Sequence, residues 1–201
     1  MFKRFLAAFL LSLTAIAAHA ESNYRVLSKP GRVDKPGMIE VREFFWYGCR
    51  HCYSLEPHLV KWLQTKPADV NFIRTPAALN PQWEVNARGY YAVDMMGLTA
   101  KTHAALFHAI HVAGERPFDQ QSLARFYSKL GVDPAAFNGN YNSFAVSGQV
   151  AKGRKLAQDY GLEGVPAVVV NGKYVISGDG PAVISTLNEL IAKERAATRR
   201  K

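Results

Sequence analysis

The chain has 201 residues, of which 48% are hydrophobic and 20% are charged, and its formal net charge is +9. This composition is typical of a globular protein and excludes a disordered or fibrous one. The basic residues form no dense block, apart from Arg195, Arg199, Arg200 and Lys201 near the C-terminus, and aromatic residues are not interleaved with them. We therefore interpret the positive charge as a solvated surface and expect no nucleic acid among the partners.

Residues 1–20 have the layout of a secretory signal peptide. A basic start is followed by an apolar stretch, which ends in the small-x-small cleavage sequence Ala18-His19-Ala20. The stretch is too short for a membrane-spanning helix, although an uncleaved anchor is the alternative. We expect export, with a mature chain that begins at Glu21.

The only two cysteines, Cys49 and Cys52, form a Cys-x-x-Cys pair between an apolar strand and a helix. Exported proteins usually keep cysteines as structural disulfides, but a bridge over two residues contributes little loop-closure entropy. At a helix N-terminus, the macrodipole and the free N–H groups stabilise a thiolate. The pair therefore predicts a redox site. Zinc would require two more ligands, and no second Cys-x-x-Cys follows, so we expect no metal and no cofactor.

The first part of the chain predicts a strand–helix–strand unit with a parallel strand pair. Glu43 is the anomaly within the apolar strand, and we expect it to be buried and coupled to the thiols. Pro57 predicts a break or kink in the helix, and Pro76 closes the second strand. The expected elements are a short strand (24–27), a buried strand (38–46), a helix (50–65) and a strand (70–74).

The next part of the chain is expected to be helical, because capping residues and glycine stops divide it into five segments. The segments are 80–96, 99–112, 119–130, a short one from 133, and 143–160. His103, His108 and His111 lie on the second of these, with no acid near them, so we interpret them as a partly exposed helix face. A strand (167–170), a type I′ turn at Asn171-Gly172, a second strand (173–176) and a helix (181–197) complete the chain.

The order of these elements, with Gly164-Val165-Pro166 before the hairpin, resembles the thioredoxin fold. In that fold the proline is cis and faces the disulfide, and Val165 would expose backbone groups that pair with an extended substrate. The implied fold class is α/β, a thioredoxin-like fold with a central mixed sheet and an inserted helical domain. We expect the thioredoxin-like parts at 21–78 and 161–201, and the inserted domain at 79–160.

A narrower resemblance is carried by the signal peptide, Glu43-Phe44-Phe45, the run from Gly48 to Tyr53, and the long helical insertion. Together these features resemble the DsbA family of periplasmic thiol:disulfide oxidoreductases. The resemblance implies a periplasmic protein that donates its disulfide to newly exported proteins by thiol–disulfide exchange. It also implies reoxidation by the membrane quinone reductase DsbB. We also expect the chain to be a monomer. A disulfide reductase or isomerase of the same fold, a chaperone-like binding module and a copper-handling protein are the alternatives.

The resemblance also implies residue roles. Cys49 is the exposed nucleophile, Cys52 is the buried resolving sulfur, and His51 stabilises the Cys49 thiolate. Glu43 is the buried acid under the disulfide. Glu56 and Arg74 match its charged partners, Pro166 matches the cis-proline, and Val165 and Pro166 bind substrate.

Arg50 departs from the family pattern, because the best-known members carry proline at this position. A fixed positive charge beside Cys49 favours the thiolate, and Arg50 is expected to face the substrate.

Overall fold

The computed structural model describes residues 24–198, so the expected signal peptide and residues 199–201 lie outside the described part. Within it, five strands form one mixed sheet in the order β1-β5-β4-β2-β3. The strands are β1 (Tyr24–Val26), β2 (Ile39–Phe45), β3 (Val70–Pro76), β4 (Ala167–Val170) and β5 (Tyr174–Ser177). The helices are α1 (Arg50–Gln64), α2 (Pro81–Asp94), α3 (Thr99–His111), α4 (Gln120–Lys129), α5 (Pro134–Tyr141), α6 (Phe144–Asp159) and α7 (Pro181–Thr198).

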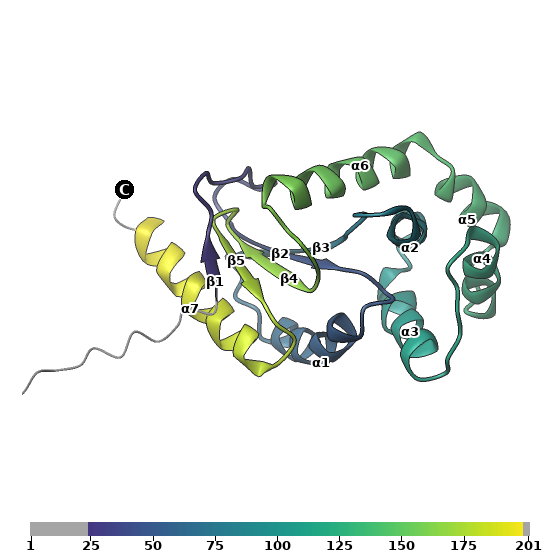
Figure 1. Cartoon of the computed structure of the whole chain (residues 1–201), viewed down its shortest axis with the longest axis horizontal. Helices are drawn as coiled ribbons and strands as arrows, with labels where there is room; N and C mark the ends of the chain where they lie inside the picture. Colours follow the sequence, from purple (N-terminus) through teal and green to yellow (C-terminus); the bar gives the residue numbers. More distant parts are fainter. Residues whose placement is uncertain (1–23, 199–201) are drawn as a thin grey trace, which may run out of the picture.

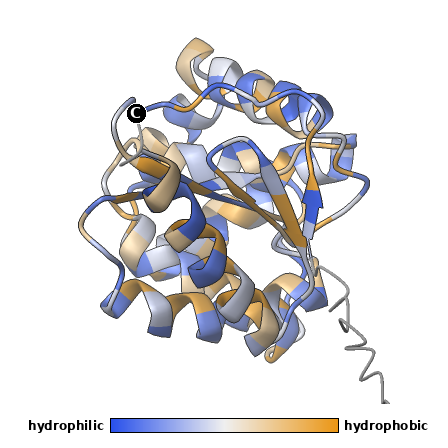
Figure 2. Ribbon diagram, turned by 90° about the vertical axis from the view of Figure 1, so that its left-hand side faces the viewer, coloured by the Kyte–Doolittle hydropathy of each residue, from blue (hydrophilic) through white to orange (hydrophobic). Residues whose placement is uncertain are grey.

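The helices cover both faces of the sheet and extend beyond one end of it. Figure 1 shows α1 and α7 on one side of the sheet, α6 on the other, and α2 to α5 gathered beyond the end at which β2 leads into α1. In Figure 2 the strands are largely hydrophobic, while the helices carry hydrophilic residues on their outer sides. The predicted α/β fold with a central mixed sheet and a helical insertion is confirmed.

The predicted parallel strand pair and hairpin are both present. β2 and β3 are parallel and are joined through α1, whereas β4 pairs antiparallel with both β2 and β5. The hairpin turn has positive φ at both central residues, 52° at Asn171 and 62° at Gly172, as a type I′ turn requires.

All seven residues of β2 are buried, because neighbouring strands flank it and helices cover both of its faces. Successive side chains of a strand point to opposite faces. Val41 packs in the cluster that contains residues of α1 and α7, while Phe44 packs with Tyr160 after α6. Glu43 therefore points to the α1 side, beneath the helix that begins at the cysteines. The prediction that Glu43 is buried is confirmed.

The predicted break of the helix at Pro57 and the predicted last residue of the second strand, 74, are wrong. α1 continues through Pro57 without a break, since its apolar residues Leu55 and Leu59 are fully buried against the sheet. β3 does not close before Pro76 but includes it, opposite Phe45. β3 is an edge strand, where the missing N–H of a proline is tolerated.

The predicted, partly exposed histidine face holds for His108, which is exposed, and His111, which is half-buried, but not for His103, which is buried. The expectation that no acid lies near these histidines is also wrong, because a carboxylate oxygen of Glu56 on α1 lies 3.4 Å from Nε2 of His103. Across residues 24–198, no helix combines the length and the apolar character needed to cross a membrane.

Candidate active site

Cys49 is the N-cap residue of α1, and its sulfur accepts a hydrogen bond from the backbone N–H of Cys52 at 3.3 Å. In the preceding loop, the ring of Trp46 packs directly against the backbone of Gly48, where a side chain would clash with it. Trp46 in turn stacks on Trp83 of α2, with ring centroids 4.9 Å apart. The helical insertion therefore helps to place the cysteine pair.

The two sulfurs lie in different environments. Both are free thiols, Cys49 partly exposed and Cys52 fully buried. A hydrogen bond from the Cys52 thiol, the backbone N–H groups of Cys52 and His51, and the charge of His51 lower the pKa of Cys49 to about 6, although burial opposes them. Burial raises the pKa of Cys52, and its contact with Cys49 adds to this effect. At neutral pH Cys49 is mostly a thiolate and Cys52 is a thiol.

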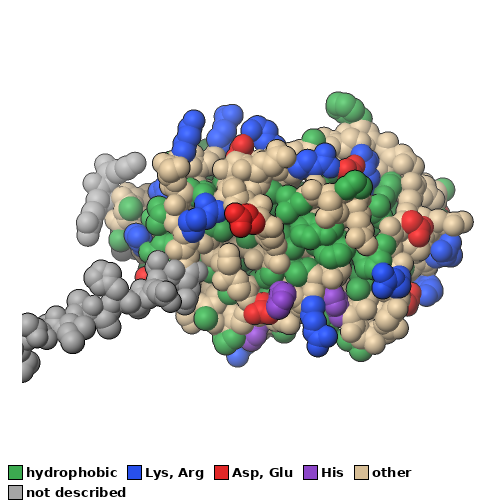
Figure 3. Space-filling view, in the orientation of Figure 1, with side chains coloured by type: hydrophobic (Ala, Val, Ile, Leu, Met, Phe, Trp, Pro, Cys, Tyr) green, Lys and Arg blue, Asp and Glu red, His purple; other side chains and the backbone are tan. Residues whose placement is uncertain are grey.

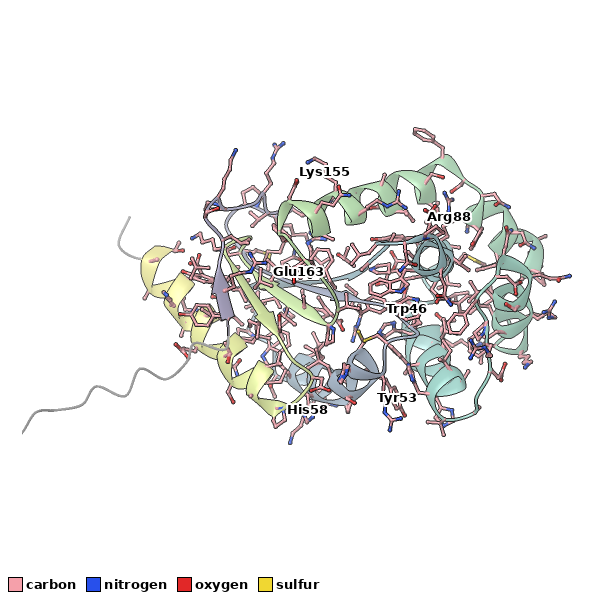
Figure 4. All side chains as sticks on the ribbon, in the orientation of Figure 1. Trp46, Tyr53, His58, Arg88, Lys155 and Glu163 are labelled. Atoms are coloured by element: carbon pink, nitrogen blue, oxygen red, sulfur yellow. The ribbon has the colours of Figure 1, made fainter. Side chains whose placement is uncertain are left out.

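The Val165–Pro166 segment faces the sulfur of Cys49. The peptide bond between the two residues is cis, as the resemblance implied, and the Cys49 thiol lies 3.3 Å from the Val165 carbonyl oxygen. A groove of about 1050 Å³ runs beside this segment, between the loop before β4 and the loop after β5. Figure 3 shows apolar side chains across the middle of this view, and Figure 4 places Glu163 in front of the sheet. Cys49 does not line the groove, but Val165, which contacts its sulfur, and His51 both do.

His51 and Arg50 are exposed in the first turn of α1. The Nδ1 atom of His51 lies 2.7 Å from a carboxylate oxygen of Asp179, in the loop between β5 and α7. The hydrogen bond and charge of Asp179 raise the pKa of His51, Cys49 raises it further, and Arg50 lowers it. Both His51 and Asp179 line the groove.

Glu43 is fully buried and lies opposite Arg74 in the register of β2 and β3. The Nε atom of Arg74 lies 3.1 Å from Glu43, but it is not aligned for a hydrogen bond, so neither oxygen of Glu43 accepts one among the described residues. Arg74 donates a hydrogen bond of 2.7 Å to Glu56. Burial raises the pKa of Glu43 to about 8; Arg74 opposes this shift and the charge of Glu56 adds to it. Glu43 is therefore mostly protonated at neutral pH.

Several residues around this site were not identified from the sequence. The Tyr47 hydroxyl lies 2.8 Å from Nδ1 of His103, and Nε2 of His111 lies 2.7 Å from the Tyr47 carbonyl oxygen. His111 also stacks on Tyr53, which Figure 4 shows near α3. The spacing of His103 from Leu106 and Phe107 could have placed it on the apolar face of α3. The glycines that flank Asp179 indicated only a loop.

No three His, Cys, Asp or Glu side chains within residues 24–198 lie close enough together to hold a metal ion.

A Cys-x-x-Cys pair at the start of the helix of a βαβ unit, faced by a cis-proline, defines a thiol:disulfide oxidoreductase of the thioredoxin fold. A family model described as a DSBA-like thioredoxin domain matches residues 40–191. The chain belongs to this DsbA family, and its activity is thiol:disulfide interchange.

Relatives support this assignment over nearly the whole length. The chain is 42% identical over 198 residues to the thiol:disulfide interchange protein DsbA of Pseudomonas aeruginosa, with 94% of each chain covered. It is 40% identical to DsbA of Pseudomonas syringae pv. tomato, with 96% of this chain and 94% of the relative covered. A crystal structure of Pseudomonas aeruginosa DsbA superimposes with a TM-score of 0.83 at 43% identity, covering 89% of this chain and 95% of the other.

Proposed function

We propose that the Cys49–Cys52 disulfide is the group that this protein donates to exported proteins as they fold. The observation that carries the proposal is the unlike environment of the two sulfurs. One is partly exposed, stabilised as a thiolate and in contact with Val165 at the edge of a groove, and the other is buried and held as a thiol. A structural disulfide would gain nothing from this difference.

The exchange proceeds in two displacements at sulfur. A client thiolate attacks Cys49, a mixed disulfide forms, and the bond between Cys49 and Cys52 breaks. A second client thiolate then attacks the client sulfur of the mixed disulfide, and Cys49 leaves as a thiolate. The client loses two electrons, and the enzyme gains them as one thiol and one thiolate.

The surroundings of each sulfur fit its step. His51 and the N-terminus of α1 stabilise the Cys49 thiolate, which makes Cys49 a good leaving group in the second displacement. Cys52 takes up a proton when it leaves in the first displacement. Glu43, which is mostly protonated at neutral pH, lies close enough for its charge to raise the pKa of Cys52. We assign Glu43 the role of proton donor and acceptor for Cys52.

Substrate binding is assigned to the segment opposite Cys49. The backbone of Val165 would pair with an extended client strand, Pro166 lines the groove, and Arg50 lies at the exposed start of α1. We also propose that DsbB reoxidises the dithiol and that the chain acts as a periplasmic monomer after cleavage before Glu21. The division into thioredoxin-like parts (21–78, 161–201) and an inserted helical domain (79–160) remains a prediction.

The test is disulfide donation to a reduced, unfolded protein with two cysteines, followed by trapping of free thiols. Stoichiometric oxidation of the client by the wild type, and none by Cys49→Ala, is the expected result. Alkylation in intact cells separates the rival activity, because a reductase would be found as a dithiol in the periplasm and a donor as a disulfide.

A further inference from the structure

A chain of polar contacts connects the helical insertion to the acid beneath the cysteines. It begins at Tyr47 and His103 and passes through Glu56 and Arg74 to Glu43. His103 is the member that comes from the insertion, on α3, and its ring is buried among aromatic rings. Those rings belong to Phe45, Tyr47, Tyr90 and Phe107.

The charges in this chain do not balance if both acids ionise. Arg74 is a single guanidinium, and two buried carboxyl groups, Glu43 and Glu56, contact it. A second unpaired negative charge in such a site is costly, so one of the two acids keeps its proton. The groups around each carboxyl decide whether Glu43 or Glu56 keeps its proton.

Glu56 accepts a hydrogen bond from Arg74, and Glu43 accepts none among the described residues. Arg74 donates to one oxygen of Glu56 at 2.7 Å, and Nε2 of His103 faces the other oxygen at 3.4 Å. That contact is too long and poorly aligned to count as a hydrogen bond, but neither of its two atoms has a hydrogen-bond partner among the described residues, so each is left facing the other. Neither oxygen of Glu43 accepts a hydrogen bond there.

The tautomer of His103 follows from both of its partners, Tyr47 at Nδ1 and Glu56 at Nε2, because an unprotonated Nε2 would set its lone pair against the carboxylate oxygen. Burial raises the pKa of Tyr47 well above its usual range, so its hydroxyl stays protonated and can donate to Nδ1 of His103 at 2.8 Å. A neutral imidazole whose Nδ1 accepts carries its proton on Nε2, the atom that faces Glu56. Burial also lowers the pKa of His103, although Glu56 opposes this shift. The ring is therefore neutral at pH 7.

We propose that His103 is a positioning residue for the redox site: its Nε2–H, oriented by Tyr47, makes Glu56 the carboxylate that carries the negative charge beside Arg74 and thereby keeps Glu43 protonated. This inference rests on the proposed role of Glu43 as the acid that serves Cys52. Among the described residues, the titratable or charged groups that face His103 or its partners are Glu43 on β2, Tyr47 before α1, Cys52 and Glu56 on α1, Arg74 on β3, Tyr90 on α2, His111 on α3 and Tyr127 on α4.

The test is the titration of the Glu43 carboxyl carbon by ¹³C NMR in the reduced protein, with Glu43→Gln to assign the signal. His103→Phe removes the imidazole N–H that faces Glu56. Glu56 should then take up the proton, and Glu43 should become the ionised carboxylate beside Arg74. The Glu43 midpoint should fall by at least one pH unit, a tenfold loss of proton affinity. His103→Gln, which keeps a donor and an acceptor, should restore most of it. His108→Phe, the same change at an exposed position of α3, should shift nothing.

An unshifted or raised Glu43 midpoint in His103→Phe would overturn the role of His103 while the proposed role of Glu43 stands. An ordinary midpoint near ~4.3 in the wild type would overturn both. If His103→Phe does not fold, ¹⁵N NMR of the His103 imidazole in the wild-type protein tests the proposal instead, because it reports which ring nitrogen carries the proton. We expect a neutral ring protonated on Nε2 at pH 7 to 8, and a ring protonated on Nδ1 or on both nitrogens in that range contradicts the proposal.

Discussion

The depressed pKa of Cys49 predicts how the stability of the reduced protein depends on pH. The folded thiol has a pKa of about 6, whereas a thiol in the unfolded chain has a pKa near ~8.5. Because the folded pKa is the lower one, the stabilisation is fully present above the unfolded pKa and is lost as pH falls through the folded pKa. The oxidised protein has no Cys49 thiolate, so it lacks this dependence.

The magnitude follows from the two pKa values. At 1.36 kcal/mol per tenfold change, the thiolate stabilises the reduced fold by about 1.4 kcal/mol at pH 7 and about 2.6 kcal/mol at pH 8. At pH 5 the stabilisation is below about 0.1 kcal/mol. Because the Cys49 sulfur is partly exposed, solvent screens its interactions, and these stabilisation energies are upper limits. The effect of the disulfide on the unfolded chain does not depend on pH. It therefore adds the same constant to the difference between the two forms at every pH and does not change its slope.

The assay is urea unfolding of the oxidised and the reduced protein at pH 5, 6, 7 and 8. The free energy of unfolding of the reduced form, minus that of the oxidised form, should rise steadily with pH. Cys49→Ala in place of the reduced form is the control, and its difference from the oxidised form should not rise. A difference that is flat or that falls between pH 5 and 8 would refute the thiolate assignment.

Three further results are expected. Iodoacetamide should modify Cys49 with a midpoint near pH 6 and leave Cys52 unmodified in the folded protein; equal rates would contradict the assigned roles. Glu43→Gln should raise the melting temperature most near pH 8 and least near pH 4, since the raised pKa of Glu43 makes its burial more costly as pH rises; a lowered melting temperature at pH 8 would place the cost elsewhere. Asp179→Asn should lower the NMR titration midpoint of His51, and an unchanged midpoint would mean that the ion pair does not form in solution.

The local pattern of the chain was sufficient to predict most of the fold. The apolar run of β2, the caps of the inserted helices and Asn171-Gly172 each act within a few residues, so one sequence contains the information. The errors at Pro57 and Pro76 have the opposite origin. There, packing on the sheet and an edge position outweighed the local preference of proline.

The site was predictable only where a motif or a family resemblance marked it. Cys49 and Cys52 are identified by spacing, but the contact between His51 and Asp179 joins residues 128 positions apart. The contact between Tyr47 and His103 spans 56 positions and joins two different parts of the fold. Periodicity places a residue on a face of its own helix, but it does not show which face of another element lies opposite.

The stability difference and the direction of electron transfer have one cause. The bonds that stabilise the Cys49 thiolate act on the reduced fold alone, so they favour uptake of electrons from a client by the same free energy. At pH 7 the value of about 1.4 kcal/mol corresponds to about 30 mV for a two-electron couple. Unfolding and redox equilibrium with glutathione must therefore report the same pH dependence. Acidification to pH 5 removes this contribution, and what remains of the oxidising power must come from the disulfide and its buried surroundings.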